Sequence, residues 1–590
     1  MCGILGIWSE NSLLNEEMVH SLAQTQSHRG KDNLSVQIIN NQHGALAHNR
    51  LSLLDLSTQG NQPMVNETKQ IFLSFNGEIY NYKELRLQLI EMGHVFISNS
   101  DAEVVLHGYE AWNVQVLQRL NGMFAFIIYD DTAQHFFIAR DRIGIKPLYY
   151  SAFENNFMAS SEIKAILHHP AFSRQINMTS FSEYFTYRYI PSPNTIYQHI
   201  YKLPPATFMI IKHGKLTEPI TYWELPFNES NISFNNLIDT VKQKLNDSVK
   251  LHFQSDVPVG IFLSGGLDST TVALLSKKNN FNPEAFTIGF DSWKNSEHQA
   301  ARQIADTFHI PFHEKILNAS ILHNITESVY NYDEPIADIS IVPTFEISRF
   351  ASKYVKTVLS GEGGDELFAG YTWHKKLMQH LSFFMLCRKI QPNMHVNYYA
   401  NAMAMGLFDK TELKKLINTS FHKDIPDDVF HFYRKYYKKE LHPLQATQYL
   451  DLKTFLPELV LTKVDRASMA HTLEVRVPFL NHEMVEFMFS LHPSLYYKKH
   501  IQKYILQEIL KNHIPEPILQ RRKQGFVGPD KAYIETTLYE QYLRKSQLAA
   551  NGLIHQQTVN HYLDLHDHWR LWKILVIEIW FKYWILMKNK

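Results

Sequence analysis

The stretch that most constrains the fold is VGIFLSGGLDSTTVALLSKK, residues 259–278. Its apolar start, 259–263, predicts a buried parallel strand, and the apolar spacing over 267–278 predicts a helix. Two glycines lie between them, where the backbone must turn tightly and can approach a ligand closely. Free backbone N–H groups and the positive end of the helix dipole then face one point, so the stretch predicts an anion-binding turn.

The six residues SGGLDS at this turn lack the Gly-Lys-[Ser/Thr] ending of a Walker A motif. They resemble the SGGxDS pyrophosphate loop of enzymes that cleave ATP between its α- and β-phosphates. The resemblance implies that ATP is bound here by Ser264, Gly265, Gly266, Leu267, Asp268 and Ser269. An ordinary strand–helix connection is the alternative, but the acidic residue is placed to hold magnesium, which favours the phosphate site.

A chain of 590 residues is too long for one hydrophobic core, so two or more domains are expected. Basic and acidic residues balance at 58 each, so no global field attracts nucleic acid or an anionic membrane.

Two cysteines cannot make a disulfide framework and suit a reducing cytoplasm. The apolar stretch 571–587 carries three charged residues and predicts an amphipathic core helix rather than a membrane span. We expect a cytoplasmic protein without nucleic-acid or membrane partners, and a homodimer stays open.

Cys2 follows the initiator methionine directly. Because cysteine and the next residue, Gly3, are small, we expect Met1 to be removed and Cys2 to become the N-terminal residue. Its own α-amino group, with an ordinary pKa near 8, can then act as the general base that forms the thiolate. A chance cysteine at this position is the alternative.

Five further segments in the first part of the chain carry polar residues beside or within apolar runs. They are HRG at 28–30, HNRLSLLDLSTQG at 48–60, IFLSFNGEIYN at 71–81, NSDAEVVLHGYE at 99–110 and FFIARDRIGIKPLYY at 136–150. With Cys2 they resemble the class II glutamine amidotransferase domain. This resemblance implies an N-terminal-nucleophile hydrolase fold, a four-layer αββα sandwich, over residues 2–212. Lys31 departs from the family, which usually has proline there, and should alter loop stiffness rather than chemistry.

The resemblance also implies roles by position in this domain. Cys2 matches the nucleophile, and Arg50 with Leu51 matches the site of the glutamine α-carboxylate, for which a guanidinium fork is suited. Asn76 and Gly77 match the oxyanion hole, where an amide side chain and a backbone N–H meet the negative oxygen. Glu78 and Asp101 match the acidic groups near the glutamine α-amino end. A surface ion pair, a turn and a helix cap are the corresponding structural alternatives.

Residues 213–236 read as a connection, and residues 237–590 as the second domain. After a helical pattern at 237–253, apolar strands are predicted at 285–290 and 355–360, as in a parallel α/β sheet. The later strand runs into GEGGDELFAGY, 361–371, where three carboxylates lie close together. Such carboxylates repel and need a cation, for which magnesium on ATP phosphates is the natural candidate.

The two glycine-rich loops resemble those of the synthetase domain of glutamine-dependent asparagine synthetases. The segments DEPIADISIVPT, KVDRASMAHTLEVRVPFLN and RRKQGF extend the resemblance. It implies an ATP-pyrophosphatase-type α/β domain with a largely helical C-terminal part. By position it assigns ATP contacts to Leu263, Ile288, Ser360 and Gly361, magnesium ligands to Asp268 and Asp365, a synthetase glutamate to Glu362 and a phosphate-stabilising lysine to Lys523. No role is assigned to Arg466, Arg476 or Arg522. For Arg476, a structural ion pair is the favoured interpretation.

The sequence therefore predicts glutamine-dependent asparagine synthesis from aspartate, glutamine and Mg-ATP, with an internal passage for ammonia implied by the family. Three alternatives remain. The same machinery could amidate another carboxylate, such as a uronic-acid sugar or a peptide, since no motif marks the aspartate contacts and Ile339 stands where proline is common. A β-lactam-forming synthetase would lack Cys2, and a non-catalytic regulator would not need an intact nucleophile and magnesium positions.

Overall fold

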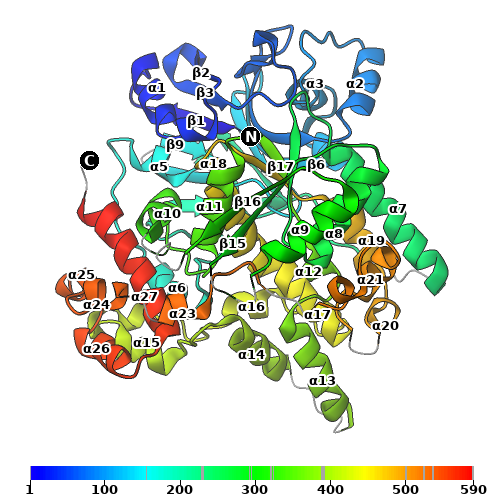
Figure 1. The fold of residues 1–590 in the computed structure, drawn as a ribbon. Coiled ribbons are helices and arrows are strands. Elements are labelled where there is room, and N and C mark those ends of the chain that lie inside the picture. Colours follow the sequence, from blue (N-terminus) through cyan, green and yellow to red (C-terminus); the bar gives the residue numbers. More distant parts are fainter. Residues whose placement is uncertain are drawn as a thin grey trace.

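The computed structural model in Figure 1 describes residues 2–153, 156–227, 232–291, 293, 296–318, 322, 324–386, 392–498, 501–521, 525–534 and 537–587. In this view the blue N-terminal elements lie above a green parallel sheet, and helices α14, α16 and α17 lie below it. The predicted boundaries at 212 and 236 stay predictions.

Two antiparallel sheets form the N-terminal part. The first has the strand order β10-β8-β9-β1-β3-β2, with the bounds β1 Gly3–Ser9, β2 Asn33–Ile39, β3 Gly44–Arg50, β8 Tyr149–Phe153, β9 Asn156–Ser160 and β10 Ile200–Lys202. The second has the order β12-β11-β7-β6-β5-β4, with β13 beside β11, and the bounds β4 Met64–Val65, β5 Ile71–Ile79, β6 Gly122–Asp130, β7 His135–Arg140, β11 Thr207–Lys212, β12 Lys215–Leu216 and β13 Ile220–Thr221.

Side-chain alternation along β1 explains how the sheets stack. Ile4 and Trp8 face the second sheet and pack with Ile127 of β6, whereas Leu5 and Ile7 face outward into a different apolar cluster. Helix α1 (Glu16–Gln24) covers that outer face, and α2 (Tyr82–Glu91) and α3 (Ala102–Trp112) cover the far face of the second sheet. The layers therefore run helix, sheet, sheet, helix, which confirms the predicted αββα sandwich.

The sandwich is completed by α4 (Val116–Arg119), α5 (Ile163–Leu167) and α6 (Met178–Tyr187). A parallel sheet follows, in the order β16-β15-β14-β17-β18, with the bounds β14 Val259–Phe262, β15 Ala285–Phe290, β16 Phe312–Leu317, β17 Thr357–Leu359 and β18 Glu474–Arg476. Its neighbours include α7 (Phe234–His252), α8 (Leu267–Lys278), α9 (His298–Phe308) and α11 (Ile341–Ala351). The predicted parallel α/β sheet is thus confirmed, and the predicted strand at 355–360 is shorter at both ends.

The rest of the chain is largely helical, as predicted. The helices are α10 Ile325–Asn331, α12 Gly364–Leu367, α13 Thr372–Leu386, α14 Pro392–Met403, α15 Lys410–Leu416, α16 His431–Tyr436, α17 Pro443–Leu450, the π-helix η7 Asp451–Leu461, α18 Thr462–Met469, α19 His482–Phe489, α20 Pro493–Tyr496, α21 Tyr504–Leu510, α22 Glu516–Leu519, α23 Asp530–Ile534, α24 Leu538–Leu543, α25 Gln547–Ala550, α26 Gln556–Asp564 and α27 His568–Phe581. Over the described residues, none of these helices combines the length and the apolar character needed to cross a membrane.

Helix α27 corrects one prediction. It lies in the core, but it is not amphipathic, because Lys573 and Glu578 are as buried as its apolar residues. The Lys573 ammonium donates to the carbonyl oxygens of Phe185 and Gly406, and Glu578 accepts a hydrogen bond from the hydroxyl of Ser546. Such partners explain the error, since charge spacing alone does not reveal which charges will be satisfied inside the protein.

Candidate active sites

Cys2 lies directly before β1, between the two sheets of the sandwich. The register of β1 against β3 pairs Gly3 with Asn49, so the next residues along, Cys2 and Arg50, come side by side. The backbone nitrogen of Cys2 donates to Asn76 Oδ1 at 2.9 Å. Asn76 belongs to β5 of the other sheet, so stacking of the sheets brings the predicted nucleophile and the predicted oxyanion residue together.

The Asn76 side chain has one polar atom left for a substrate. Its Oδ1 is engaged by Cys2, while its Nδ2 is buried and has no hydrogen-bond partner among the described residues. A buried amide N–H without a partner is costly unless something accepts from it. The adjacent Gly77 must be glycine, because a Cβ there would lie 2.1 Å from the carbonyl oxygen of Met123. Asn76 and Gly77 are thus arranged as a donor and a close backbone beside Cys2.

Burial raises the pKa of the Cys2 thiol above its ordinary value. A buried thiol stays protonated until a base takes its proton. The nitrogen of the same residue becomes an α-amine once Met1 is removed, which places a base next to the sulfur.

Arg50 ends β3, and its guanidinium is held by the loop that follows. It donates to the carbonyl oxygens of Ser57, at 2.6 Å, and Asp55, and to Asn61 Oδ1 at 2.8 Å. These three acceptors are neutral, and burial lowers the pKa of Arg50. A buried guanidinium held by neutral oxygens retains its affinity for a carboxylate. Leu51 lies beside it, packed against Met469 of the second part of the chain.

Glu78 and Asp101 are buried on the same side of this site. Asp101 Oδ2 accepts from the backbone N–H of Ile79 at 2.7 Å, and burial raises its pKa to about 6. Burial also raises the pKa of Glu78 well above its ordinary value, against the opposing charge of Arg476. Arg476 of β18 lies 2.8 Å from Glu78, so the structure pairs this predicted glutamine contact with the parallel sheet.

Arg476 pairs with a second carboxylate, that of Glu474, at 2.6 Å. Burial alone would raise the pKa of Glu474, but the positive charges of the chain terminus and of Arg476 hold it at about 2. The expected structural ion pair of Arg476 is confirmed, and it joins the two parts of the chain beside the predicted glutamine contacts.

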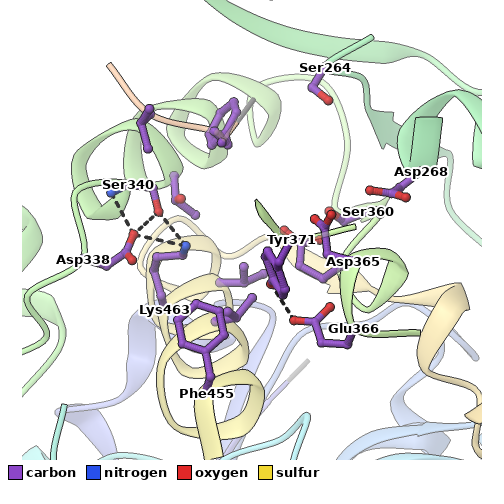
Figure 2. Close-up of a pocket in the computed structure, with 18 of the residues that line it drawn as sticks. Ser264, Asp268, Asp338, Ser340, Ser360, Asp365, Glu366, Tyr371, Phe455 and Lys463 are labelled. Atoms are coloured by element: carbon purple, nitrogen blue, oxygen red, sulfur yellow. Dashed lines mark hydrogen bonds and ion pairs between the residues drawn. The ribbon is translucent and has the colours of Figure 1, made fainter. Parts of the chain in front are cut away.

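The second candidate site is a cavity of about 410 Å³ at the carboxyl ends of β14 and β17 (Figure 2). These strands are parallel neighbours, so the loops after them meet at one edge of the sheet. Predicted residues that line the cavity are Leu263, Ser264, Asp268, Ser269, Ser360, Gly361, Glu362 and Asp365. This size suits a nucleotide-scale ligand.

Other predicted residues are placed differently. Gly265, Gly266 and Leu267 form the turn and the start of α8 without lining the cavity. Gly265 has φ of +73°, and a Cβ there would lie 2.8 Å from the backbone nitrogen of Ala301, so the turn requires glycine. Ile288 packs in the core with Phe290, Leu317 and Ile347 instead of lining the cavity. Lys523 lies outside the described residues, just before Gly525 and Phe526, which do line it.

Lys503, which the sequence analysis missed, lies between the two predicted magnesium ligands. Its ammonium contacts Asp268 and lies 2.7 Å from Asp365 Oδ1. It precedes α21 in the unremarkable segment HIQKYILQEIL, so no motif marks it. The predicted need for a cation near these carboxylates was sound, and within the protein a lysine meets it.

Glu366 and Glu362 are the other carboxylates of this loop, and their side chains have different surroundings. Burial, and then repulsion from Asp365, raise the pKa of Glu366 to about 8. Its Oε1 accepts from the hydroxyl of Tyr371 at 2.7 Å (Figure 2). Glu362 also lines the cavity and accepts a hydrogen bond from Ser360. All three loop carboxylates, those of Glu362, Asp365 and Glu366, therefore border the space open to a ligand.

The opposite wall of the cavity carries charges of both signs, also missed from the sequence (Figure 2). Lys463 Nζ lies 2.5 Å from Ser340 Oγ and 3.5 Å from Asp338 Oδ1. Arg188, from the end of α6, reaches the same carboxylate at 3.7 Å. Burial would raise the pKa of Asp338, but Lys463 and Arg188 hold it below its ordinary value. This wall therefore offers a carboxylate and two cations to a small ligand.

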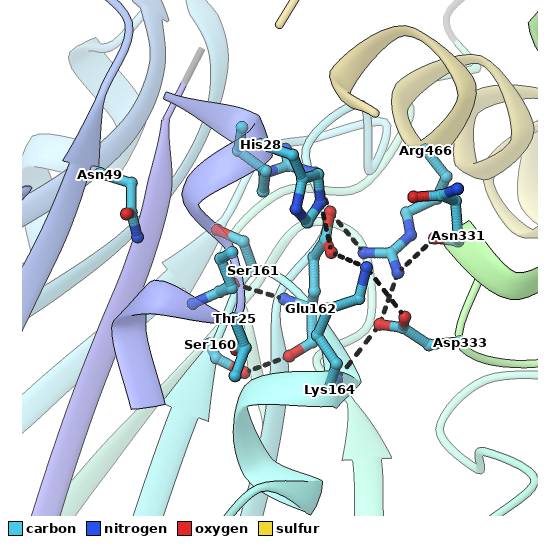
Figure 3. Close-up of polar contacts among 12 residues, drawn as sticks. Thr25, His28, Asn49, Ser160, Ser161, Glu162, Lys164, Asn331, Asp333 and Arg466 are labelled. Carbon is cyan, nitrogen blue, oxygen red and sulfur yellow. Dashed lines mark hydrogen bonds and ion pairs between the residues drawn. The ribbon is translucent and has the colours of Figure 1, made fainter. Parts of the chain in front are cut away.

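Glu162 gathers three cationic side chains, of which Arg29 and Arg466 are buried and Lys164 is partly buried (Figure 3). Its carboxylate lies 2.9 Å from Arg29, 2.8 Å from Lys164 and 2.8 Å from Arg466. Arg466 also pairs with Asp333 at 2.5 Å. Burial alone would raise the pKa of Glu162, but Arg466, and then contacts with His28 and Lys164, hold it well below its ordinary value. Arg466 therefore holds the sandwich to the second part of the chain rather than contacting a ligand.

Comparison with known proteins agrees with this two-site arrangement. The family model described as asparagine synthase matches residues 240–585, and the one described as a glutamine amidotransferase domain matches residues 1–223. The glutamine-hydrolyzing asparagine synthetase 1 of Bacillus subtilis is 30% identical over 98% of this chain and 96% of its own. A putative glutamine-hydrolyzing asparagine synthetase of Mycobacterium bovis is 32% identical over 90% of this chain and 88% of its own.

Some relatives are named as amidases. Amidase chry2 of Gibberella zeae is 26% identical over 96% of this chain and 95% of its own. Relatives that match nearly the whole chain therefore include both asparagine synthetases and an amidase. The identity of the carboxylate that is amidated must come from the residues that line the cavity.

Proposed function

The chain belongs to the asparagine synthase family, and from this premise we propose that it makes asparagine from aspartate, with glutamine as nitrogen donor and ATP as energy source. One observation carries the proposal: a single fold holds Cys2 hydrogen-bonded to Asn76 and, separately, the SGGLDS turn on a cavity with Asp268 and Asp365. The first arrangement suits release of ammonia from an amide, and the second suits activation of a carboxylate.

In the first half-reaction, the Cys2 thiolate attacks the side-chain amide carbon of glutamine. The α-amino group of Cys2 takes the thiol proton and passes it to the leaving nitrogen as the C–N bond breaks. The free Nδ2 of Asn76 and the backbone at Gly77 hold the negative oxygen of the tetrahedral intermediate. Water then hydrolyses the thioester to glutamate. Arg50 holds the α-carboxylate, and Asp101 with Glu78 attracts the α-ammonium.

In the second half-reaction, a β-carboxylate oxygen of aspartate attacks the α-phosphorus of ATP, and the bond to the bridging oxygen breaks to release pyrophosphate. Ammonia then attacks the β-carbonyl carbon, AMP leaves, and asparagine forms. The turn after β14 and Lys503 face the phosphates, while Glu362 is placed in the cavity to accept a proton from the attacking nitrogen. Lys523 is assigned to phosphate charge by resemblance alone.

The residues present fit Mg²⁺. Two carboxylates, those of Asp268 and Asp365, converge on one cationic group, and oxygen ligands are those that Mg²⁺ prefers. We assign them as its ligands. When bound with ATP, the ion would neutralise phosphate charge.

The substrate that accepts the nitrogen is inferred from the cavity wall opposite Asp268 and Asp365. Aspartate carries an α-ammonium and an α-carboxylate besides the reacting group. Asp338 can hold the first, and Lys463 with Arg188 can hold the second, so the wall matches an amino acid. A uronic-acid sugar has no ammonium for Asp338, and the contact would be lost. This mixed charge favours aspartate over a sugar acid.

Ammonia made at Cys2 must reach the cavity without protonation in bulk water. The ion pair of Arg476 with Glu78, and the packing of Leu51 on Met469, place the two sites on either side of one buried contact. An internal route through this contact is part of the proposal. The chain has only two cysteines, too few for a disulfide framework, which supports the proposal that the reaction takes place in the cytoplasm.

The test supplies the full chain with Mg-ATP, glutamine and one acceptor, and follows AMP, pyrophosphate and amidated product. We expect product only with aspartate, and a raised KM for aspartate in Asp338→Asn with the KM for glutamine unchanged. Release of pyrophosphate with glucuronate but not with aspartate would refute asparagine synthesis.

A further inference from the structure

Two histidines and two glutamates gather in the N-terminal sandwich, and none of the four belongs to either candidate site. Glu67 lies in the turn between β4 and β5, His94 follows α2, and His107 with Glu110 projects from α3. One donor atom of each lies within 4.8 Å of the donor atoms of the others. We propose that these four side chains bind a divalent transition-metal cation, with Zn²⁺ as the best fit.

His107 is the observation that points to a ligand. Its side chain is 2% exposed, and neither Nδ1 nor Nε2 has a hydrogen-bond partner among the described residues. A buried imidazole must have at least one nitrogen that donates, so leaving both without partners is costly. The ring instead faces the carboxylates of Glu67 and Glu110 at distances beyond a hydrogen bond.

Those distances have the size of a metal coordination sphere. His107 Nδ1 lies 3.5 Å from Glu67 Oε2 and 3.8 Å from Glu110 Oε2, and His94 Nδ1 lies 3.7 Å from the same Glu110 oxygen. Ligands about 2.0–2.1 Å from a tetrahedral zinc are about 3.4 Å apart. The four donors are therefore spaced to surround an ion after small side-chain adjustments.

A fifth residue orients His107. Its Nε2 lies 3.6 Å from Glu103 Oε1, one turn earlier on α3. Glu103 is fixed in turn, because it accepts from the backbone N–H groups of Ile97 and Ser98 and from the Ser98 hydroxyl. After a small adjustment that closes this 3.6 Å gap, Glu103 would accept a hydrogen bond from Nε2 and leave Nδ1 as the ligand, as in carboxylate–histidine–zinc arrangements. The edge of the Phe96 ring also packs on this imidazole.

The donor set selects the class of cation. Two imidazole nitrogens with two carboxylate oxygens suit Zn²⁺ and its neighbours, whereas Mg²⁺ and Ca²⁺ prefer oxygen alone. Two carboxylates balance the charge of a divalent ion. Glu67 and Glu110 are 36% and 27% exposed, so the ion can enter from solvent. Bound there, it would tie α3, which begins after Asp101, to the β4–β5 turn.

Binding can be measured without reference to activity. We would use the full chain carrying Cys2→Ala, because a free N-terminal cysteine can itself chelate metal through sulfur and nitrogen. After treatment with EDTA and with Mg²⁺ in excess, Co²⁺ is titrated in and its visible d–d absorption is followed. One Co²⁺ per chain, displaced by Zn²⁺, is expected. Histidine and glutamate ligands should give a low-symmetry four- or five-coordinate spectrum.

Variants locate the ion. His94→Gln and Glu110→Gln both change partly exposed side chains, and each should weaken Co²⁺ binding about tenfold or more. His20→Gln and Glu91→Gln change exposed residues of the same types on α1 and α2 and should leave binding unchanged. Zn²⁺ should also raise the Tm of the parent and not that of the doubly substituted chain. The proposal is overturned if the parent binds no Co²⁺, or if the double variant binds it as tightly, which would leave a metal-free cluster of histidine–glutamate contacts.

Discussion

The two candidate sites neutralise their charges in different ways. At the glutamine site, Arg476 is fully buried and paired with Glu78 and Glu474, so the charges are fixed before any substrate arrives. At the ATP site, one lysine, Lys503, contacts two carboxylates on the wall of an open cavity. A fixed pairing suits a small substrate that always has the same charges. A single ammonium shared by two carboxylates at the edge of a cavity suits a site that Mg-ATP must enter and pyrophosphate must leave.

Because of this difference, the two sites should respond differently to the loss of a charged side chain. The first is preorganised by sheet stacking and is sensitive to loss of a buried charge, whereas the second is assembled from loops and is sensitive to its cations. Four changes test the contrast.

The change with the largest expected effect is Cys2→Ala. It removes the nucleophile of one site and leaves the other intact, so glutamine-dependent synthesis should fall at least about a thousandfold. Synthesis with ammonium salts should be retained. Both are measured as asparagine formed with the same Mg-ATP and aspartate. Appreciable glutamine-dependent product from this variant would show that Cys2 is not the nucleophile.

Next comes Lys503→Met, which leaves Asp268 and Asp365 facing each other without the ammonium. Loss of one preorganised cation should lower aspartate-dependent pyrophosphate release about 10²–10³-fold. Glutamine hydrolysis, measured as glutamate formed in the absence of ATP, should hardly change. Lys511→Met alters an exposed lysine at the end of the same helix and serves as control. Equal loss of both activities would mean that Lys503 supports the fold as a whole.

Arg476→Met should affect both sites through stability. Removing one partner of a buried ion pair leaves uncompensated carboxylates and lowers the free energy of unfolding by about 3–5 kcal/mol. Unfolding in urea measures this, with the exposed Arg544→Met as the matched control. Unchanged stability together with a selective rise in the KM for glutamine would instead make Arg476 a substrate-positioning residue.

The smallest effect concerns Glu366, whose pKa rises to about 8 in the folded protein. The folded chain then binds a proton that the unfolded chain releases near pH 4.5, so stability falls as pH rises from about 4.5 to 8. Glu366→Gln retains an acceptor for Tyr371 and should remove part of that fall, on the order of a few kcal/mol. Tm measured between pH 5 and 8 checks this against the exposed Glu440→Gln. Parallel curves for all three proteins would contradict the shifted pKa.

Local patterns predicted much of this molecule. The helix at 267–278 and the strand at 285–290 have the predicted bounds, because each is a short apolar pattern ended by polar or glycine residues. The αββα layers and the parallel sheet were also predicted, through the resemblance of segments near Cys2 and the SGGLDS turn. Arg50 comes beside Cys2 through strand register, and Asn76 meets Cys2 through stacking of the two sheets; the sequence alone states neither.

The residues that were missed share one property: their partners are distant in sequence. Lys503 meets Asp268 only after α21 packs on α8, and Arg188 reaches Asp338 from the first part of the chain. The four metal-site candidates come from a turn, a loop and a helix, without the short spacing that marks metal motifs. Ile288 was misplaced for the opposite reason, since an apolar residue at a strand end can face either a ligand or the core.

Arg476 has one more consequence. Its guanidinium reaches Glu78 at the glutamine site, while its backbone oxygen accepts from the N–H of Ser360, at 2.9 Å, on the ATP loop. A single residue therefore belongs to both reaction centres. If nucleotide binding at Ser360 shifts this residue and thereby changes glutamine affinity, thermodynamic linkage requires glutamine to change nucleotide affinity by the same factor. Binding of ATP and binding of glutamine would then be coupled, which would limit hydrolysis of either one when the other is absent.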